Sequence, residues 1–291
     1  MGGIDQLPAI TGGVTRRVRR TRLVLPAVLA TGLLGLAGCS AEDVGALKRL
    51  GMPVPASDRA VPILNLWIDT WIAAGLVGFF VWGLIIWAIV AYRKRTDNDA
   101  LPRQNRYNLP MEVLYTLAPF IIIGVLFYYT ISVQNTVLAK TPQPAHTINV
   151  NGQKWSWTFN YKEAGNSAVG NDVWEAGTIQ RTPDLYLPVG ETVHFNLSSP
   201  DVIHSFWVPA FAFKMDVVPG RANNFELTPT KEGVFRGKCA ELCGTYHSAM
   251  LFNVHVVSPN EYNAYLKRLA DAGQIGEAKG AANAYPEGGQ R

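Results

Sequence analysis

Two long stretches without a single charged residue constrain this chain more than any other feature of its sequence. The first extends from Thr70 to Tyr92 and the second from Val113 to Ala139. About 20 apolar residues in a helix are enough to cross the hydrocarbon core of a bilayer. The sequence therefore predicts two transmembrane helices that form a hairpin over residues 63–139.

The loop between the two runs, residues 93–108, predicts the orientation of the hairpin. Five basic residues lie in it: Arg93, Lys94, Arg95, Arg103 and Arg106. Short loops rich in lysine and arginine stay on the cytoplasmic side of a membrane. Both ends of the hairpin are therefore expected outside the cytoplasm, with Tyr128 and Tyr129 in an outer aromatic belt.

The amino-terminal region has the composition of an export signal. Five arginines precede a short apolar stretch, residues 23–36, which is too short to span a bilayer. This pattern predicts a secretory signal over residues 1–38 and an extracytoplasmic segment over residues 39–62. The ending Leu-Ala-Gly-Cys resembles a bacterial lipobox, which predicts a lipid anchor on Cys39. The alternative is an ordinary signal with an incidental cysteine.

From His146 onward, polar and apolar residues alternate in short runs, as in Thr192–Leu197. Alternation with period two is typical of half-buried β-strands. Similar runs predict strands at residues 146–151, 155–161, 184–187, 202–208, 223–227, 233–238 and 251–257. Several short strands separated by turn residues predict an all-β sandwich or barrel over residues 140–258.

Residues 259–291 are expected to form one short helix and a flexible tail. Ser258, Pro259 and Glu261 make a typical helix start, and the helix is predicted to end near Ala270. The tail from Gly273 onward is rich in glycine and alanine and has no periodicity.

The charge distribution does not indicate a nucleic-acid partner. The chain carries a net charge of +4, but residues 141–258 hold eight Lys and Arg against ten Asp and Glu. The basic excess lies near the amino terminus and in the loop of the hairpin, where it sets membrane topology.

The residues most suited to chemistry lie between Cys239 and Met250. Two cysteines, one histidine and one methionine occur there within twelve residues, in the pattern Cys-x3-Cys-x3-His-x2-Met. Thiolates, thioethers and imidazoles are ligands that suit copper. His204, in another strand and loop, could supply a further nitrogen. The cysteines alone leave a disulfide or a redox pair as alternatives, and zinc is disfavoured by the export signal.

Together with the preceding His-Ser-Phe-Trp-Val-Pro sequence, this stretch resembles the CuA signature of the bacterial cytochrome c oxidase subunit 2 family. The resemblance implies a cupredoxin-like Greek-key sandwich after the hairpin. It also implies a binuclear copper centre in which Cys239 and Cys243 bridge two copper ions. The remaining ligands that it implies are His204, His247, Met250 and the backbone carbonyl of Glu241.

The resemblance implies three further roles. Trp155 is the ring through which electrons enter, although aromatic residues in strands usually serve packing, as is expected of Trp157. The Glu241 side chain binds a magnesium or manganese ion shared with subunit 1, unless it is a solvated loop acid. Glu112 lies at the cytoplasmic mouth of the K proton channel, although an acid in the first helical turn is also favoured by the helix dipole.

Other charged residues receive weaker expectations. By the resemblance, Lys214, Asp216 and Arg221 brace the copper domain against subunit 1. Three acids could form a docking patch for a basic cytochrome, or could simply be solvated: Glu163, Asp172 and Glu175. Three histidines match no metal spacing and are expected to be surface or hydrogen-bonded strand residues: His146, His194 and His255.

The function implied by the resemblance is electron transfer in the plasma membrane of a bacterium. Cytochrome c, or a c-type haem domain of a neighbouring complex, donates electrons to the copper pair outside the cytoplasm. They pass to haem in subunit 1, where oxygen becomes water and protons are pumped, and subunit 3 is a further partner. The alternatives are a thioredoxin-like copper chaperone, with one anchor and alternating strands and helices, and a structural lipoprotein with a disulfide.

Overall fold

The computed structural model describes residues 40–94 and 104–278, which form two compact units separated after Gly51. The predicted signal, Cys39 and the last thirteen residues lie outside the described residues. In the first unit, α2 (Ala41–Lys48) begins at a capping box, in which Ser40 and Asp43 bond each other's backbone N–H groups. The sequence prediction did not include this short helix.

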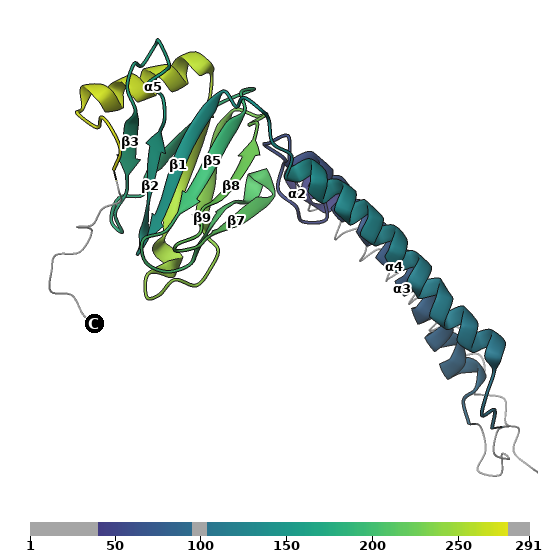
Figure 1. The fold of residues 1–291 in the computed structure, drawn as a ribbon. Coiled ribbons are helices and arrows are strands. Elements are labelled where there is room, and N and C mark those ends of the chain that lie inside the picture. Colours follow the sequence, from purple (N-terminus) through teal and green to yellow (C-terminus); the bar gives the residue numbers. More distant parts are fainter. Residues whose placement is uncertain (1–39, 95–103, 279–291) are drawn as a thin grey trace, which may run out of the picture. The chain divides into compact units, whose positions relative to one another are not determined.

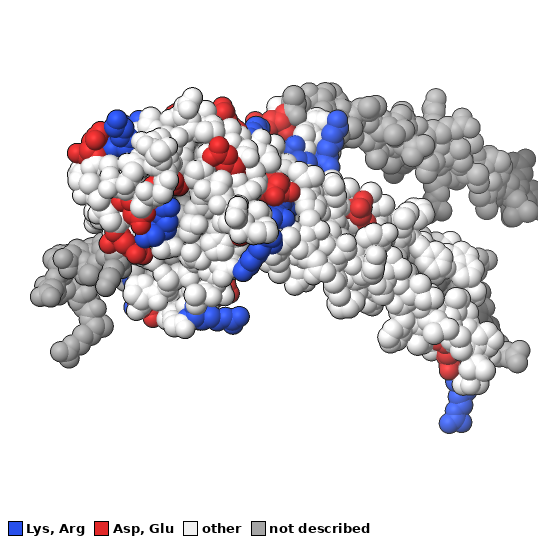
Figure 2. All heavy atoms as spheres, turned by 45° about the horizontal axis from the view of Figure 1, so that its top comes forward, with Lys and Arg blue, Asp and Glu red and all other residues white. Residues whose placement is uncertain are grey.

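Two long helices follow, α3 (Ala60–Ala91) and α4 (Leu109–Val137). Both are long and apolar enough to cross a membrane. The surface of the two helices carries almost no charged side chains over most of its length (Figure 2). The first helix begins ten residues before the uncharged run, so its first turns extend beyond the length that a bilayer requires.

Specific polar contacts hold the ends of the hairpin. The Arg59 guanidinium, just before α3, donates to the carbonyls of Thr136 and Ala139 at the end of α4. The Thr136 carbonyl also accepts the Ala139 N–H at 3.4 Å, so Arg59 adds to the hydrogen bonding at the end of the helix. At the other end, Asn108 caps α4, and Glu112 accepts the Asn108 backbone N–H at 3.2 Å.

The rest of the second unit is a sandwich of two five-stranded sheets (Figure 1). One sheet has the order β3-β2-β1-β5-β8, and the other has the order β4-β10-β9-β6-β7. The strands are β1 (His146–Gln153), β2 (Ser156–Tyr161), β3 (Val173–Ala176), β4 (Asp184–Pro188), β5 (Val193–Ser198), β6 (His204–Val208), β7 (Phe213–Val217), β8 (Asn223–Leu227), β9 (Gly233–Cys239) and β10 (Leu251–Val257). The pairs β1–β5 and β4–β10 are parallel and the others are antiparallel. The predicted hairpin followed by an all-β cupredoxin-like sandwich is confirmed.

The sandwich core is aromatic. Trp157, Phe206 and Phe252 meet in edge-to-face and stacked pairs with ring centroids 4.8 to 5.8 Å apart. Such pairs add to the energy gained by burying their large apolar surfaces. The alternation in each strand points one set of side chains into this core, which is why most predicted strands agree with the structure.

The carboxyl-terminal part is more ordered than the sequence indicated. After α5 (Pro259–Asp271), Gly276 donates its N–H to the Asp172 carbonyl at 2.8 Å. Asn160 of β2 exchanges two hydrogen bonds with the backbone of Ala278. The segment therefore covers the outer side of β2, and this explains why β2 is buried on both faces. The prediction of a flexible tail from Gly273 is wrong for residues 273–278.

Candidate metal centre

Strand pairing brings the predicted ligands together from two separate parts of the chain. His204 begins β6, and β6 pairs with β9 so that Phe206 lies opposite Cys239. The Ala240 N–H donates to the Ser205 carbonyl at 2.9 Å, which continues this pairing into the cysteine loop. The loop then closes, because the Cys239 N–H donates to the Met250 carbonyl at 3.0 Å.

The side chains of this loop and of His204 converge on one small volume. The Sγ atoms of Cys239 and Cys243 lie 3.8 Å apart, and His204 Nδ1 lies 3.9 Å from Cys239 Sγ. On the other side, His247 Nδ1 lies 3.5 Å and Met250 Sδ 3.8 Å from Cys243 Sγ. The ligand atoms of His204 and both cysteines all lie within 4.8 Å of one another.

The two cysteines are free thiols that are almost completely buried, with 4% and 5% of their surfaces exposed. A disulfide needs a sulfur separation near 2.05 Å, so the observed 3.8 Å excludes that bond in this structure. Met250 and His204 are fully buried, and His247 is half-buried. The alternative of a structural disulfide is therefore not supported.

Hydrogen bonding makes the two thiols unequal. Burial raises the pKa of Cys239, but hydrogen bonds from His204 and the nearby backbone outweigh it and lower this pKa to about 7. Burial and then the neighbouring Cys239 thiolate raise the pKa of Cys243 to about 12. Without a metal, the pocket therefore favours one thiolate over two, because the second negative charge would lie beside the first.

The geometry and chemistry of this pocket fit a soft metal. A first-row metal ion bonds thiolate sulfur at about 2.3 Å, so one ion can contact both sulfurs across 3.8 Å. Thiolate and thioether ligands select copper or zinc among the biological metals, and buried Met250 adds a thioether that zinc sites rarely use. The residues present therefore suit copper.

Asp201 fixes the orientation of His204, and the sequence prediction missed this residue. Its carboxylate lies 2.8 Å from His204 Nε2 and accepts the N–H groups of Lys154 and Val202. Burial raises the pKa of Asp201, but these hydrogen bonds outweigh it and hold the pKa below its ordinary value. With Nε2 engaged, Nδ1 faces the cysteines. The only signal in the sequence was an acid three residues before the histidine.

Glycine at position 152 allows the His204 ring to approach the neighbouring sheet. A Cβ atom at Gly152 would lie 3.0 Å from the Trp157 ring and 3.3 Å from His204. Trp157 is fully buried and donates its indole N–H to the Met250 carbonyl. As expected, Trp157 is a packing residue, and it supports the floor of the pocket.

Trp155 lies beside the cluster. Its indole N–H donates to the carbonyl of Cys243 at 3.1 Å, and its ring meets Tyr246 edge-to-face at 5.1 Å. Gly244 has a φ of +121°, and a Cβ there would lie 3.0 Å from the Trp155 ring. Because the ring is only partly buried, it connects the pocket to the surface.

Three exposed apolar side chains are neighbours of the predicted ligands along the chain. Leu242 is 78% exposed, and Ile203 and Tyr246 are also exposed. Each of the three directly precedes a predicted ligand in the chain. Large apolar side chains with this exposure are uncommon elsewhere on the described sandwich. These three residues are called the apolar rim.

The charged residues singled out in the sequence have different surroundings. The Glu241 carbonyl lies 3.2 Å from Cys239 Sγ, and its side chain is exposed. Lys214, Asp216 and Arg221 are exposed on and after β7 and form no ion pair with the described residues. Glu112 lies in the first turn of α4, as the alternative based on the helix dipole expects, and it also accepts the Asn108 backbone N–H.

The expected acidic docking patch is wrong. Glu163 and Glu175 are only 4% and 6% exposed. Glu163 bonds His146 and the Tyr262 hydroxyl, and Glu175 pairs with Arg181 at 2.7 Å. Asp172 pairs with Lys162. These acids hold the sandwich and α5 together and are not available to attract a basic protein.

The three remaining histidines are hydrogen-bonded strand residues, as predicted. His146 lies between Glu163 and Glu191, at 2.7 and 2.6 Å. His194 contacts Glu226 and Asn196, both at 2.9 Å, and His255 contacts Asp184 at 3.1 Å. None of the three belongs to a metal-binding group within the described part of the chain.

The fold and the cluster define a class of protein: a two-helix hairpin of membrane-spanning length followed by a cupredoxin-like domain with a candidate metal site. Residues 146–257 match the family described as "Cytochrome C oxidase subunit II, periplasmic domain". A probable cytochrome c oxidase subunit 2 of Streptomyces avermitilis is 43% identical, with 90% of this chain and 91% of that protein covered. The cytochrome c oxidase subunit 2 of Mycobacterium tuberculosis is 37% identical, with 95% and 89% covered.

The chain belongs to the cytochrome c oxidase subunit 2 family, whose members are components of heme-copper oxidases and normally bind copper. This confirms the resemblance found in the sequence. Among solved structures, the periplasmic domain of subunit II of cytochrome oxidase from Bradyrhizobium japonicum is 27% identical. The match covers 46% of this chain and 99% of that domain, with a TM-score of 0.40.

Proposed function

We propose that this chain receives electrons from cytochrome c, or from a c-type haem domain, at a binuclear copper centre outside the cytoplasm. The electrons pass to haem in subunit 1, where oxygen is reduced to water and protons are pumped. The observation that carries the proposal is the convergence of two thiols, two imidazoles and a thioether from separate strands on one buried pocket.

The proposed copper ligands are the Cys239 and Cys243 sulfurs, the imidazoles of His204 and His247, Met250 and the Glu241 carbonyl. Two copper ions that share both thiolates would spread one electron over both metals. The chain supplies rigidity, because Asp201 holds His204 and strand pairing holds the cysteine loop. Ligands that cannot move require little rearrangement when the charge changes.

Trp155 is proposed as the point at which electrons reach the pocket. Its indole N–H bonds the carbonyl of Cys243, so a short route of one hydrogen bond and covalent bonds leads from the ring to a ligand. The apolar rim of Ile203, Leu242 and Tyr246 is proposed to contact the donor. Since two of the three acids considered for docking are buried, the contact depends on apolar area more than on charge.

Other roles expected from the family are proposals of the same kind. The exposed Glu241 carboxylate is proposed to share a magnesium or manganese ion with subunit 1, and Glu112 to accept protons at the K channel. Lys214, Asp216 and Arg221 are proposed to contact subunit 1, and subunit 3 is a further proposed partner. A lipid on Cys39 would add an anchor to the two helices in the bacterial plasma membrane.

Matched histidine variants test the copper assignment in the assembled oxidase. His204→Gln is expected to abolish the purple absorption of a mixed-valence copper pair and nearly all cytochrome c oxidation. His255→Gln is the control, because His255 also bonds a carboxylate but lies outside the cluster. Cys239→Ser should behave like His204→Gln. Normal turnover in either cluster variant would contradict the proposal.

A further inference from the structure

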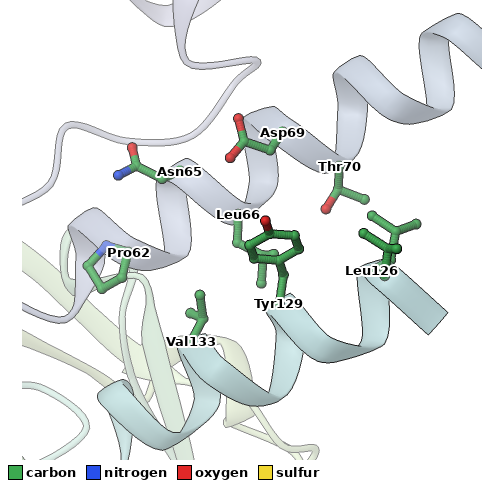
Figure 3. A pocket seen from close by; sticks show the side chains of 9 residues that line it. Pro62, Asn65, Leu66, Asp69, Thr70, Leu126, Tyr129 and Val133 are labelled. Atoms are coloured by element: carbon green, nitrogen blue, oxygen red, sulfur yellow. The ribbon is translucent and has the colours of Figure 1, made fainter. Parts of the chain in front are cut away.

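A groove between α3 and α4 contains polar side chains whose hydrogen-bonding groups have no partner among the described residues. It has a volume of about 500 Å³ and is lined on α3 by Asn65, Asp69 and Thr70, and on α4 by Tyr129. Figure 3 shows Asn65 and Asp69 on the same side of α3, and the Tyr129 ring rising from α4 across the gap. None of the four forms a hydrogen bond with the described residues.

The position of Asp69 along the helix places the groove at one surface of a bilayer. The uncharged run from Thr70 to Tyr92 has 23 residues, or roughly 34 Å at 1.5 Å per residue, which already exceeds the hydrocarbon thickness of about 30 Å. Asp69 therefore lies at the level of the lipid headgroups. By the proposed topology, on which this inference rests, that is the outer surface.

Among the described residues of the hairpin, no cation pairs with the carboxylate of Asp69. The two basic residues that flank the hairpin here are engaged elsewhere. Arg59 bonds the carbonyls of Thr136 and Ala139, and Lys140 bonds Asn224. An acid at the edge of a membrane-spanning segment is usually paired with a group of opposite charge. The groove therefore suits a ligand that brings its own cation.

The other groups favour a ligand that also carries an anion. The Asn65 amide and the Thr70 and Tyr129 hydroxyls are hydrogen-bond donors, which suit phosphate oxygens. Leu66 and Leu126 line the same groove and offer apolar contact to an acyl chain. A basic side chain from a neighbouring helix would satisfy Asp69 but not the hydrogen-bond donors around it.

From this combination we infer that the groove binds the headgroup of an aminophospholipid such as phosphatidylethanolamine. The primary ammonium donates to Asp69, and the phosphate accepts from the donors around it. A trimethylammonium group has no N–H, so phosphatidylcholine cannot make the bond to Asp69. Phosphatidylglycerol brings no cation at all.

Native mass spectrometry of the assembled oxidase tests this inference. The oxidase is placed in nanodiscs of equal parts phosphatidylethanolamine, phosphatidylcholine and phosphatidylglycerol, and the lipids retained on this subunit are counted. Preferential retention of phosphatidylethanolamine is expected. Asp69→Asn should reduce it about tenfold, the usual effect of losing one charge-assisted hydrogen bond. Tyr129→Phe should reduce it less.

Asp271→Asn is the control, because it removes an exposed carboxylate at the end of α5. Equal retention of the three lipids, or full retention by Asp69→Asn, would overturn the inference. The purple absorption and cytochrome c oxidation are measured on the same samples. If they are normal while lipid selectivity is absent, only the lipid site is wrong.

Discussion

Removing the charge of Asp201 should weaken copper binding although Asp201 is not itself a ligand. Its carboxylate lies 2.8 Å from His204 Nε2, and it also accepts backbone N–H groups of Lys154 and Val202. A hydrogen bond to a charged group contributes about 1.5–3 kcal/mol. Loss of such a bond behind a metal-binding histidine usually lowers metal affinity about 10- to 100-fold.

Two variants separate the charge from the loop contacts. Asp201→Asn keeps an acceptor of the same shape, so about a tenfold loss of copper affinity is expected. Asp201→Ala also frees the N–H groups of Lys154 and Val202, so its loss should approach about a hundredfold. Asp184→Asn is the matched control, since Asp184 bonds His255 at 3.1 Å outside the cluster.

Copper affinity is measured by competition with a chelator, following the visible absorption of the full-length chain in detergent. The same titration is run on all three variants and on the unchanged chain. If Asp201→Asn releases copper no more easily than Asp184→Asn, the carboxylate does not position His204. The reasoning about the support of the pocket would then be refuted.

Further predictions concern the pH dependence, the packing and the docking of the domain. Glu163 and Glu191 outweigh the effect of burial and raise the pKa of His146 above 6.5. His146→Gln should therefore destabilise the domain most below pH 6.5 and progressively less at alkaline pH. A difference in urea unfolding that does not depend on pH would contradict this prediction. Gly237→Ala would place a Cβ 2.1 Å from the Phe252 ring and should lower the free energy of unfolding by roughly 1–3 kcal/mol. Gly165→Ala is the control, because a Cβ there meets nothing within 4 Å and should leave the free energy of unfolding unchanged. Leu242→Asp should raise the KM for cytochrome c. For the unchanged chain, added salt should change this KM little. A steep dependence of the KM on salt would show that charge guides docking.

Much of the fold follows from short-range patterns. The two uncharged runs predicted both long helices, and alternation gave β8 and β10 with the bounds that the structure has. Two strands were missed. β3 has only four residues, too few for a clear alternation. β7 has five and does alternate apolar with charged residues from Phe213 to Val217, but so short a run was not distinguished from the turns around it. Both strands lie at sheet edges.

The ligand cluster was predictable because its residues carry a specific spacing, but its support was not. Asp201 reaches His204 through a turn whose shape depends on the whole sandwich. Glu163 and Glu175 are buried because α5 and nearby loops pack over them. The composition of the sequence does not show that these segments pack there. These acids were therefore expected at the surface, whereas in the structure they are buried and hydrogen-bonded.

Copper stoichiometry tests the central claim most directly. The full-length chain, purified in detergent and loaded with copper, is analysed for metal content and for free thiols. Two copper ions per chain, with both Cys239 and Cys243 unreactive until the metal is removed, are predicted. A disulfide between these cysteines, or a single ion bound without His204, would contradict the account.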